Sequence, residues 1–206
     1  FQFSAVSWTN CRMTNIYGLG AIDQSVPHID IDVTPPGSTF DCEYKNWFLD
    51  NRGTPTAPMV KISDLTNGAT SGESTFRNLV LEHGTHGGAL HLYSLKHLIL
   101  DTVFVDDSTI FTEPAILIDQ SALGQSPNYN TFISCVSNEG GGALAPDLKI
   151  VGTAGNIATL LNCDFGDVNI AATSYNQIGG IVGTDHGISP LVMRSDTLKR
   201  GDGKET

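Results

Sequence analysis

The sequence predicts an all-β fold, a parallel β-helix in which short strands wind into stacked coils. Two kinds of strand-like run alternate along the 206 residues, and runs of one kind return about every 30 residues. Gly, Asn and Asp gather between the runs, and these residue types adopt the backbone conformations that sharp corners need. No stretch of ten or more residues has the periodicity of an amphipathic helix. We therefore expect a solenoid of about five or more coils.

The first kind of run is short and rich in β-branched residues, and a turn often precedes it. Its members are residues 59–62, 89–92, 116–118, 148–151 and 180–182. The steps are about 30, 27, 32 and 32 residues between the anchors Val60, Leu90, Leu117, Lys149 and Ile181. Such a regular step indicates one equivalent strand per coil, with equivalent strands about 4.8 Å apart.

The second kind of run places a polar residue before apolar residues. Its members are residues 46–49, 78–81, 97–100, 131–134 and 159–162. Stacking equivalent strands buries columns of like side chains. The predicted columns are Leu79, Leu98, Phe132 and Leu160 in one wall, and Val60, Leu90, Leu117 and Ile150 in another.

The chain divides into three segments. Residues 1–39 are expected to form N-terminal coils or a cap, residues 40–193 the parallel β-helix, and residues 194–206 a hydrophilic tail or linker. The first residue is Phe1, which suggests an excised domain or a processed product. Polar insertions at 68–74 and 122–129 interrupt the repeat. In solenoids such insertions collect on one face and frequently form the binding surface.

Composition excludes several classes of partner. The net charge of −11 with only 11 basic residues argues against nucleic acid, since phosphate contacts require clustered Lys and Arg. No apolar stretch reaches the length of about 18 residues that a membrane span needs. The four cysteines form no CxxC pair, which argues against a zinc site. Cys135 and Cys163 fall in strand-like runs, where small core residues are expected.

The runs 75–84 and 87–92, together with 130–135 and 140–144, carry a family resemblance. They resemble coils of the right-handed parallel β-helix superfamily, which includes pectate lyases, polygalacturonases and bacteriophage tailspikes. The likeness covers roughly Phe40 to Val182 and is nearest to the phage spikes. The chain has Asp106-Asp107 and Gly84-Thr85-His86-Gly87, but it lacks the Asn-Thr-Asp and Arg-Ile-Lys motifs of the polygalacturonases.

The resemblance implies a viral tailspike or fibre domain on a virion exterior or in an extracellular setting. It further implies a homotrimer that recognises a host-surface polysaccharide, with depolymerase activity left open. Two alternatives remain: a secreted polysaccharide lyase or glycoside hydrolase, and a bacterial surface adhesin.

Carboxylates on neighbouring coils are the candidate catalytic residues. Glu82 lies on one coil, and Asp101, Asp106 and Asp107 lie on the next. Equivalent residues of adjacent coils lie about 5 Å apart, within the range of carboxylate separations that glycoside hydrolysis uses. The alternative interpretation is a solvated acidic corner.

His83, His86 and Tyr129 are the candidate ligand-binding residues. The two histidines precede a first-kind run, and Tyr129 stands in a polar insertion where its ring is available for stacking on a sugar. His91 and His97 are nearby, but a metal site requires three converging ligands. We therefore predict neither a bound metal nor a cofactor.

Overall fold

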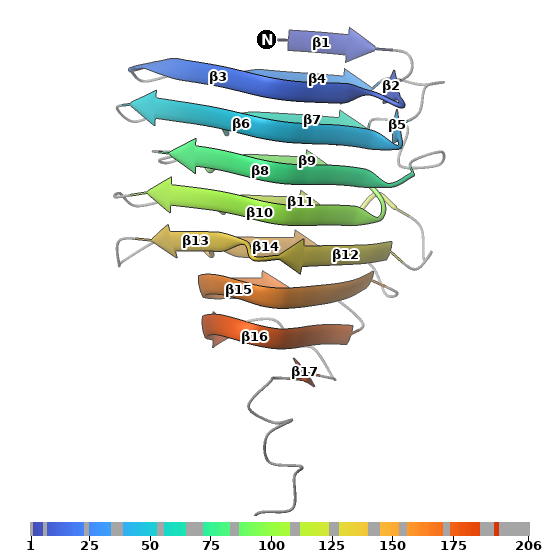
Figure 1. Cartoon of the computed structure of the whole chain (residues 1–206), viewed down its shortest axis with the longest axis vertical. Helices are drawn as coiled ribbons and strands as arrows, with labels where there is room; N and C mark the ends of the chain where they lie inside the picture. The colour runs from blue at the N-terminus through green and yellow to red at the C-terminus, as the bar shows by residue number, and fades with distance from the viewer. Residues whose placement is uncertain are drawn as a thin grey trace, which may run out of the picture.

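The computed structural model describes residues 2–5, 8–22, 25–33, 39–52, 56–64, 72–82, 87–107, 112–123, 128–139, 145–152, 156–170, 174–185 and 192–193. All regular secondary structure within these ranges is β-strand, and all strand pairs are parallel. The strands are stacked along the long axis of the molecule (Figure 1). The predicted all-β parallel solenoid is therefore confirmed.

The strands form two ladders. The short strands are β1 (Gln2–Ala5), β4 (Ile29–Val33), β7 (Val60–Asp64), β9 (Leu90–Tyr93), β11 (Ile116–Asp119) and β14 (Leu148–Val151). The long strands are β3 (Arg12–Ile22), β6 (Cys42–Arg52), β8 (Ser74–Glu82), β10 (Leu98–Asp107), β12 (Asn128–Ile133) with β13 (Val136–Glu139), β15 (Asn156–Ile170) and β16 (Ser174–Asp185). Two further pairs involve β2 (Trp8–Thr9) with β5 (Thr39–Phe40), and β17 (Val192–Met193) with β16. A coil consists of one long strand and the short strand that follows it.

The number of regular turns is smaller than predicted. Three turns, β6–β7, β8–β9 and β10–β11, keep one uninterrupted register with one another. Before them, the register between β3 and β6 shifts between Leu19 and Ile22. After them, Ser134 and Cys135 separate β12 from β13 within one long strand. The solenoid therefore has about three regular turns rather than five, with less regular coils beyond them.

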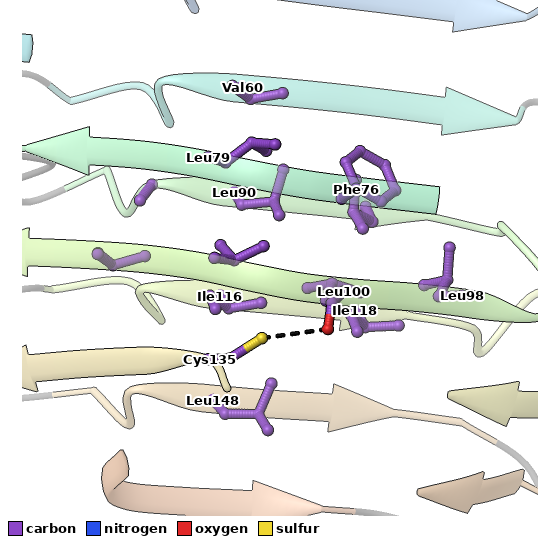
Figure 2. Packing of buried hydrophobic residues seen from close by; sticks show 14 of the residues in the cluster. Val60, Phe76, Leu79, Leu90, Leu98, Leu100, Ile116, Ile118, Cys135 and Leu148 are labelled. Atoms are coloured by element: carbon purple, nitrogen blue, oxygen red, sulfur yellow. Dashed lines mark hydrogen bonds between the residues drawn. The ribbon is translucent and has the colours of Figure 1, made fainter. Parts of the chain in front are cut away.

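The interior is a stack of aligned apolar side chains. Val60, Leu90, Ile116 and Leu148 occupy one register position on four successive short strands, and each is fully buried (Figure 2). The predicted step from Val60 to Leu90 is confirmed. The predicted place of Leu117 is wrong by one residue, because Leu117 pairs with His91.

The predicted column of the long strands needs a similar correction. Phe132 does stack on Leu160, as predicted. Its partner on the other side is Leu100 rather than Leu98, and Leu79 pairs with Val103. Leu98 and Leu100 both point into the core, two residues apart on β10, so the sequence alone does not show which of them is level with Phe132.

The last predicted short strand, residues 180–182, belongs to the other ladder. Ile181 pairs with Asp164, within the long strands β15 and β16. The position on β14 is instead taken by the end of β15, where Val168 pairs with Leu148 and Ile170 with Ile150. The chain enters this short ladder directly from β15, so the expected 30-residue step does not apply here.

Each long strand bends at a residue whose backbone is in the left-handed conformation, and these residues are aligned across the ladder. Asn15, Asn46 and Asn78 have φ values of 59°, 58° and 52°, a region that Asn tolerates better than most residues. Asn46 Nδ2 donates to Asn15 Oδ1 at 3.1 Å, and Asn78 Nδ2 donates to Asn46 Oδ1 at 3.2 Å. The line continues through other residue types at Thr102, Ser134 and Asn162. The predicted role of Asn in the corners is therefore confirmed.

Cysteine and tryptophan side chains contribute to the core. Cys135 and Cys163 are free thiols with exposed fractions of 0% and 1%, as expected of small core residues. Trp47 is 1% exposed, and its Nε1 donates to the carbonyl of Met13 at 3.0 Å. This hydrogen bond satisfies the indole N–H inside the solenoid.

Candidate functional site

Both polar insertions leave the solenoid at the same edge. One joins the end of β7 at Asp64 to the start of β8 at Ser74, and the other joins the end of β11 at Asp119 to the start of β12 at Asn128. Each therefore connects the end of a short strand to the start of a long strand, at the right of Figure 1. We call this the insertion edge. Residues 65–71 and 124–127 of the insertions lie outside the described residues.

A pocket of about 430 Å³ lies at the insertion edge. Four strands contribute one aligned row to its lining, which runs through Asp32, Ser63, Tyr93 and Asp119. We call it the edge pocket. Its volume falls in the range of about 300–1,000 Å³ that small-ligand sites occupy. Regular stacking of β4, β7, β9 and β11 thus brings together residues that are far apart in the sequence.

Lys61 lies between two carboxylates at one side of the edge pocket. Its Nζ is 3.3 Å from Asp30 Oδ1 and 3.2 Å from Asp32 Oδ1. Partial burial alone lowers the pKa of Lys61, but the hydrogen bonds to Asp32 and Asp30 outweigh this effect, so that the pKa is raised. The side chain therefore remains a cation that is already paired.

Tyr93 forms the middle of the pocket row and contacts a buried histidine. Its hydroxyl lies 3.5 Å from Nδ1 of His91, whose Nε2 lies 2.9 Å from the carbonyl oxygen of Pro114. Burial lowers the pKa of His91, against the opposing effects of Pro114 and Glu113. A neutral imidazole that donates from Nε2 to Pro114 leaves Nδ1 to accept from the Tyr93 hydroxyl.

The acidity of the Tyr93 hydroxyl is also shifted. Desolvation, reinforced by the charge of Asp119, raises the pKa of Tyr93. The phenol is therefore protonated at neutral pH; its single proton is donated to His91 Nδ1, and its oxygen is left to accept a hydrogen bond in the edge pocket.

Asp119 lies at the opposite side of the row from Asp32. The backbone N–H of Ser121 donates to Asp119 Oδ1 at 2.9 Å, and the Ser121 hydroxyl donates to the same oxygen at 2.6 Å. Both hydrogen bonds hold the carboxylate from one side. Asp119 is only partly buried and lines the edge pocket, so it remains able to accept from a ligand.

The predicted ligand residue Tyr129 also lies at the insertion edge. It is 49% exposed, and its ring stacks on His97 with a centroid distance of 5.5 Å and an interplanar angle of 22°. Tyr129 is the second residue of β12 and His97 directly precedes β10, so the two lie next to each other across the ladder. His83 and His86 lie outside the described residues.

The four predicted catalytic carboxylates do not form one group. Glu82 and Asp106 pair in the register of β8 and β10, at the end of the long strands that lies away from the insertion edge. Asp101 lies before the bend at Thr102, and its Oδ2 accepts from Arg77 Nε at 2.9 Å. Asp107 pairs with Glu139 of β13. The structure thus brings Glu82 and Asp106 together and places Asp101 in an ion pair.

A second, shallower hollow of about 360 Å³ opens at the starts of β3, β6 and β8. It is lined by charges of both signs, including Arg12, Glu43, Glu73 and Arg77. Arg12 Nε lies 3.4 Å from Glu43 Oε2, and Arg77 is bound to Asp101. Because these charges pair with one another, the hollow offers fewer uncommitted groups than the edge pocket.

Sequence reasoning missed the residues of the edge pocket. A signal was present, since polar residues close each first-kind run, as Ser63-Asp64, Tyr93-Ser94 and Asp119 do. The register between the coils places them in one row, and the sequence does not show this register. In the part of the chain that the structure describes, no three His, Cys, Asp or Glu side chains gather as a metal ion would require. Nor do the described residues include a helix suited to crossing a membrane.

Comparison of the chain with protein-family models, with curated proteins and with solved structures finds no match. The parallel β-solenoid is therefore established by the strand pairing alone.

Proposed function

We propose that the chain is a spike or fibre domain, on a virion exterior or another extracellular surface, that recognises a host-surface glycan at the insertion edge. One observation carries the proposal. The edge pocket, the exposed ring of Tyr129 and the strand ends from which the two polar insertions leave all lie along the same edge of the solenoid. Binding residues presented beside a regular scaffold are typical of recognition surfaces.

The chemistry of the edge pocket suits a sugar. Asp32 and Asp119 present carboxylate oxygens that accept hydrogen bonds from hydroxyl groups, and Tyr93 presents a ring and a hydroxyl oxygen that also accepts. The net charge of −11 argues against a nucleic acid in the same place, because phosphates would be repelled.

A row of apolar side chains on the outer face supports assembly into a homotrimer. Equivalent positions of five long strands carry Tyr17, Phe48, Val80, Phe104 and Val136. Tyr17 is 70% exposed and stacks on Phe48 at 5.2 Å. A continuous apolar stripe on an outer face is typical of an interaction surface. We name these five residues the outer apolar row.

Charged residues of opposite sign flank the outer apolar row. Lys45 precedes it on β6, beside the Arg77–Asp101 ion pair of β8 and β10, while Glu82 and Asp106 follow it on β8 and β10. In a cyclic assembly with parallel axes, the basic flank of one copy faces the acidic flank of the next. This complementarity supports a closed ring of copies, such as the proposed homotrimer.

A glycan microarray tests the recognition proposal. The wild-type chain is expected to bind one family of host-surface polysaccharides, and Asp119→Asn is expected to weaken that binding about ten-fold by removing a charged acceptor. Asp164→Asn is the matched control, since it removes an exposed carboxylate of β15 beyond the bend at Asn162, away from the edge pocket. Absence of binding to every glycan, or loss of binding in the control alone, would contradict glycan recognition at this edge.

Cleavage of the same polysaccharide is a second candidate function, supported by the Glu82–Asp106 pair. Directly paired positions on adjacent strands lie about 4.8 Å apart, so their carboxyl groups can reach the spacing of about 5–5.5 Å that retaining glycosidases use. One carboxyl would act as the acid and the other as the nucleophile. Reducing-end release by the wild type, lost in Glu82→Gln and in Asp106→Asn but kept in Asp101→Asn, is the expected pattern. Equal turnover in all of these variants would exclude the pair.

A further inference from the structure

We propose that the edge pocket selects a ligand carrying an ammonium group, such as the free amine of a hexosamine unit, which it binds between Asp119 and Tyr93. This inference rests on the proposed glycan recognition and names the chemical class of the sugar. It concerns residues that the sequence did not single out.

The edge pocket already holds one ammonium group, which belongs to the protein. Lys61 Nζ is within 3.3 Å of Asp30 and 3.2 Å of Asp32, at one side of the row of pocket residues. At the other side of Tyr93 stands Asp119, also a partly buried carboxylate. Its described donors, both from Ser121, use only Oδ1. Asp119 is therefore a second carboxylate of the edge pocket, and it has no cationic partner among the described residues.

The charge balance of the edge pocket points to a cationic ligand. Asp32 and Asp119 line it together with a single cation, Lys61, which Asp30 also binds. The chain segments 34–38, 65–71 and 124–127, which leave from the same edge, contain no charged residue. No Lys or Arg from these segments can therefore reverse the balance. A uronic acid or a sialic acid would meet excess negative charge and a lysine that is already paired.

The aromatic ring of Tyr93 adds a second source of selectivity. Tyr93 lies next to Asp119 in the register, and both residues line the edge pocket. An ammonium group over an aromatic ring is attracted by the ring quadrupole, and a carboxylate beside it neutralises the charge. The raised pKa of Tyr93, caused by desolvation and then by Asp119, keeps the phenol neutral. A neutral ring and a carboxylate together bind a charged amine, and they interact less favourably with its uncharged N-acetyl form.

The test measures the affinity of the whole chain for three tetrasaccharides by titration calorimetry at pH 6 and low salt. The probes are β-1,4-linked glucosamine, its fully N-acetylated counterpart, and galacturonic acid. We expect the glucosamine tetramer to bind at least about ten-fold more tightly than the other two. Asp119→Asn is expected to remove most of this preference, whereas Asp164→Asn, at an exposed carboxylate of β15, keeps it. Circular dichroism confirms that both variants are folded.

The other outcomes are decisive in different ways. Equal or tighter binding of the N-acetylated tetramer overturns the ammonium inference and leaves glycan recognition standing. Equal loss of glucosamine binding in Asp119→Asn and Asp164→Asn also overturns it, because the net charge of −11 would then attract the amine without a site. Failure of all three probes overturns the inference, and it extends to the proposed function only if the microarray shows no bound glycan either.

Discussion

Gln120 and Asn130 hold each other through two reciprocal hydrogen bonds inside the solenoid. Asn130 Nδ2 donates to Gln120 Oε1 at 2.9 Å, and Gln120 Nε2 donates to Asn130 Oδ1 at 3.1 Å. Gln120 Nε2 also lies 2.6 Å from the carbonyl oxygen of Leu95. Both side chains are almost completely buried. The pair joins the two ends of the second polar insertion, directly behind Asp119 of the edge pocket.

Gln120→Leu is expected to lower the free energy of unfolding by about 1–3 kcal/mol, because it leaves the buried amide of Asn130 without its partner. Urea denaturation measures the change. The double variant Gln120→Leu with Asn130→Leu removes both polar groups and should recover part of the loss. A double variant whose loss of unfolding free energy exceeds the summed losses of the two single variants would contradict the assignment of the loss to an unsatisfied amide.

Asn78→Ala is expected to destabilise the chain by about 1–2 kcal/mol, because Ala is strained at the φ of 52° that Asn78 adopts. Asn78→Gly relieves the strain while removing the same hydrogen bond to Asn46. Thermal or urea denaturation of the two variants separates the backbone term from the hydrogen bond. Equal losses in both variants would show that the left-handed conformation is not what selects Asn at this position.

Acidification is expected to destabilise the fold through His91. Burial lowers the pKa of His91 below its ordinary value of 6.5, so the unfolded chain binds a proton before the folded chain does. Stability therefore falls as the pH drops below about 6.5, with a slope of up to about 1.4 kcal/mol per pH unit, until the folded pKa is reached. Urea denaturation between pH 5 and pH 7.5, compared with His91→Gln, measures this contribution. An unchanged slope in the variant would show that His91 is not its source.

Gly88→Ala is expected to destabilise the turn that precedes β9. Gly88 has a φ of 79°, and a Cβ there would overlap the carbonyl oxygen of Pro114 and the ring of His91. The conformational strain alone costs about 1–2 kcal/mol, and the overlap adds to it. Urea denaturation checks the loss, with Ser25→Ala at an exposed position outside the strands as a control. Wild-type stability in Gly88→Ala would contradict the close packing of this turn.

The outer apolar row predicts a concentration-dependent assembly. The wild-type chain should have a trimeric mass in light scattering after size exclusion, and Phe104→Glu should shift it towards the monomer, since a charge would be buried at the interface. Phe104 is 37% exposed, so the substitution leaves the interior of the solenoid intact. A wild-type monomer at high concentration would contradict the homotrimer.

The fold was predictable because a single sequence shows the repeat period and the two kinds of strand. It does not show the register between the coils. Val60 and Leu90 were aligned correctly because each follows a clear turn. Leu117 was misplaced, since apolar residues flank it on both sides and either phase fills a core. Ile181 was misplaced because β15 continues into the short ladder without a loop, which a constant period cannot reveal.

The candidate site was predicted only where its residues carried a local signal. Tyr129 stood in a polar insertion, and the structure places it at the insertion edge. Lys61, Tyr93 and Asp119 lie at the ends of ordinary strands, and only correct stacking brings them to one pocket. Asp101 was grouped with Asp106 because the bend at Thr102 leaves no mark in the spacing of carboxylates.

Hydrogen–deuterium exchange with and without the glycan that the microarray identifies tests the central claim most directly. Binding at the edge pocket should slow exchange in residues 93–95 and 119–123, which surround Tyr93 and Asp119, and leave residues 80–82 and 104–107 unchanged. Slower exchange confined to residues 80–82 and 104–107, around Glu82 and Asp106, would contradict recognition at the insertion edge.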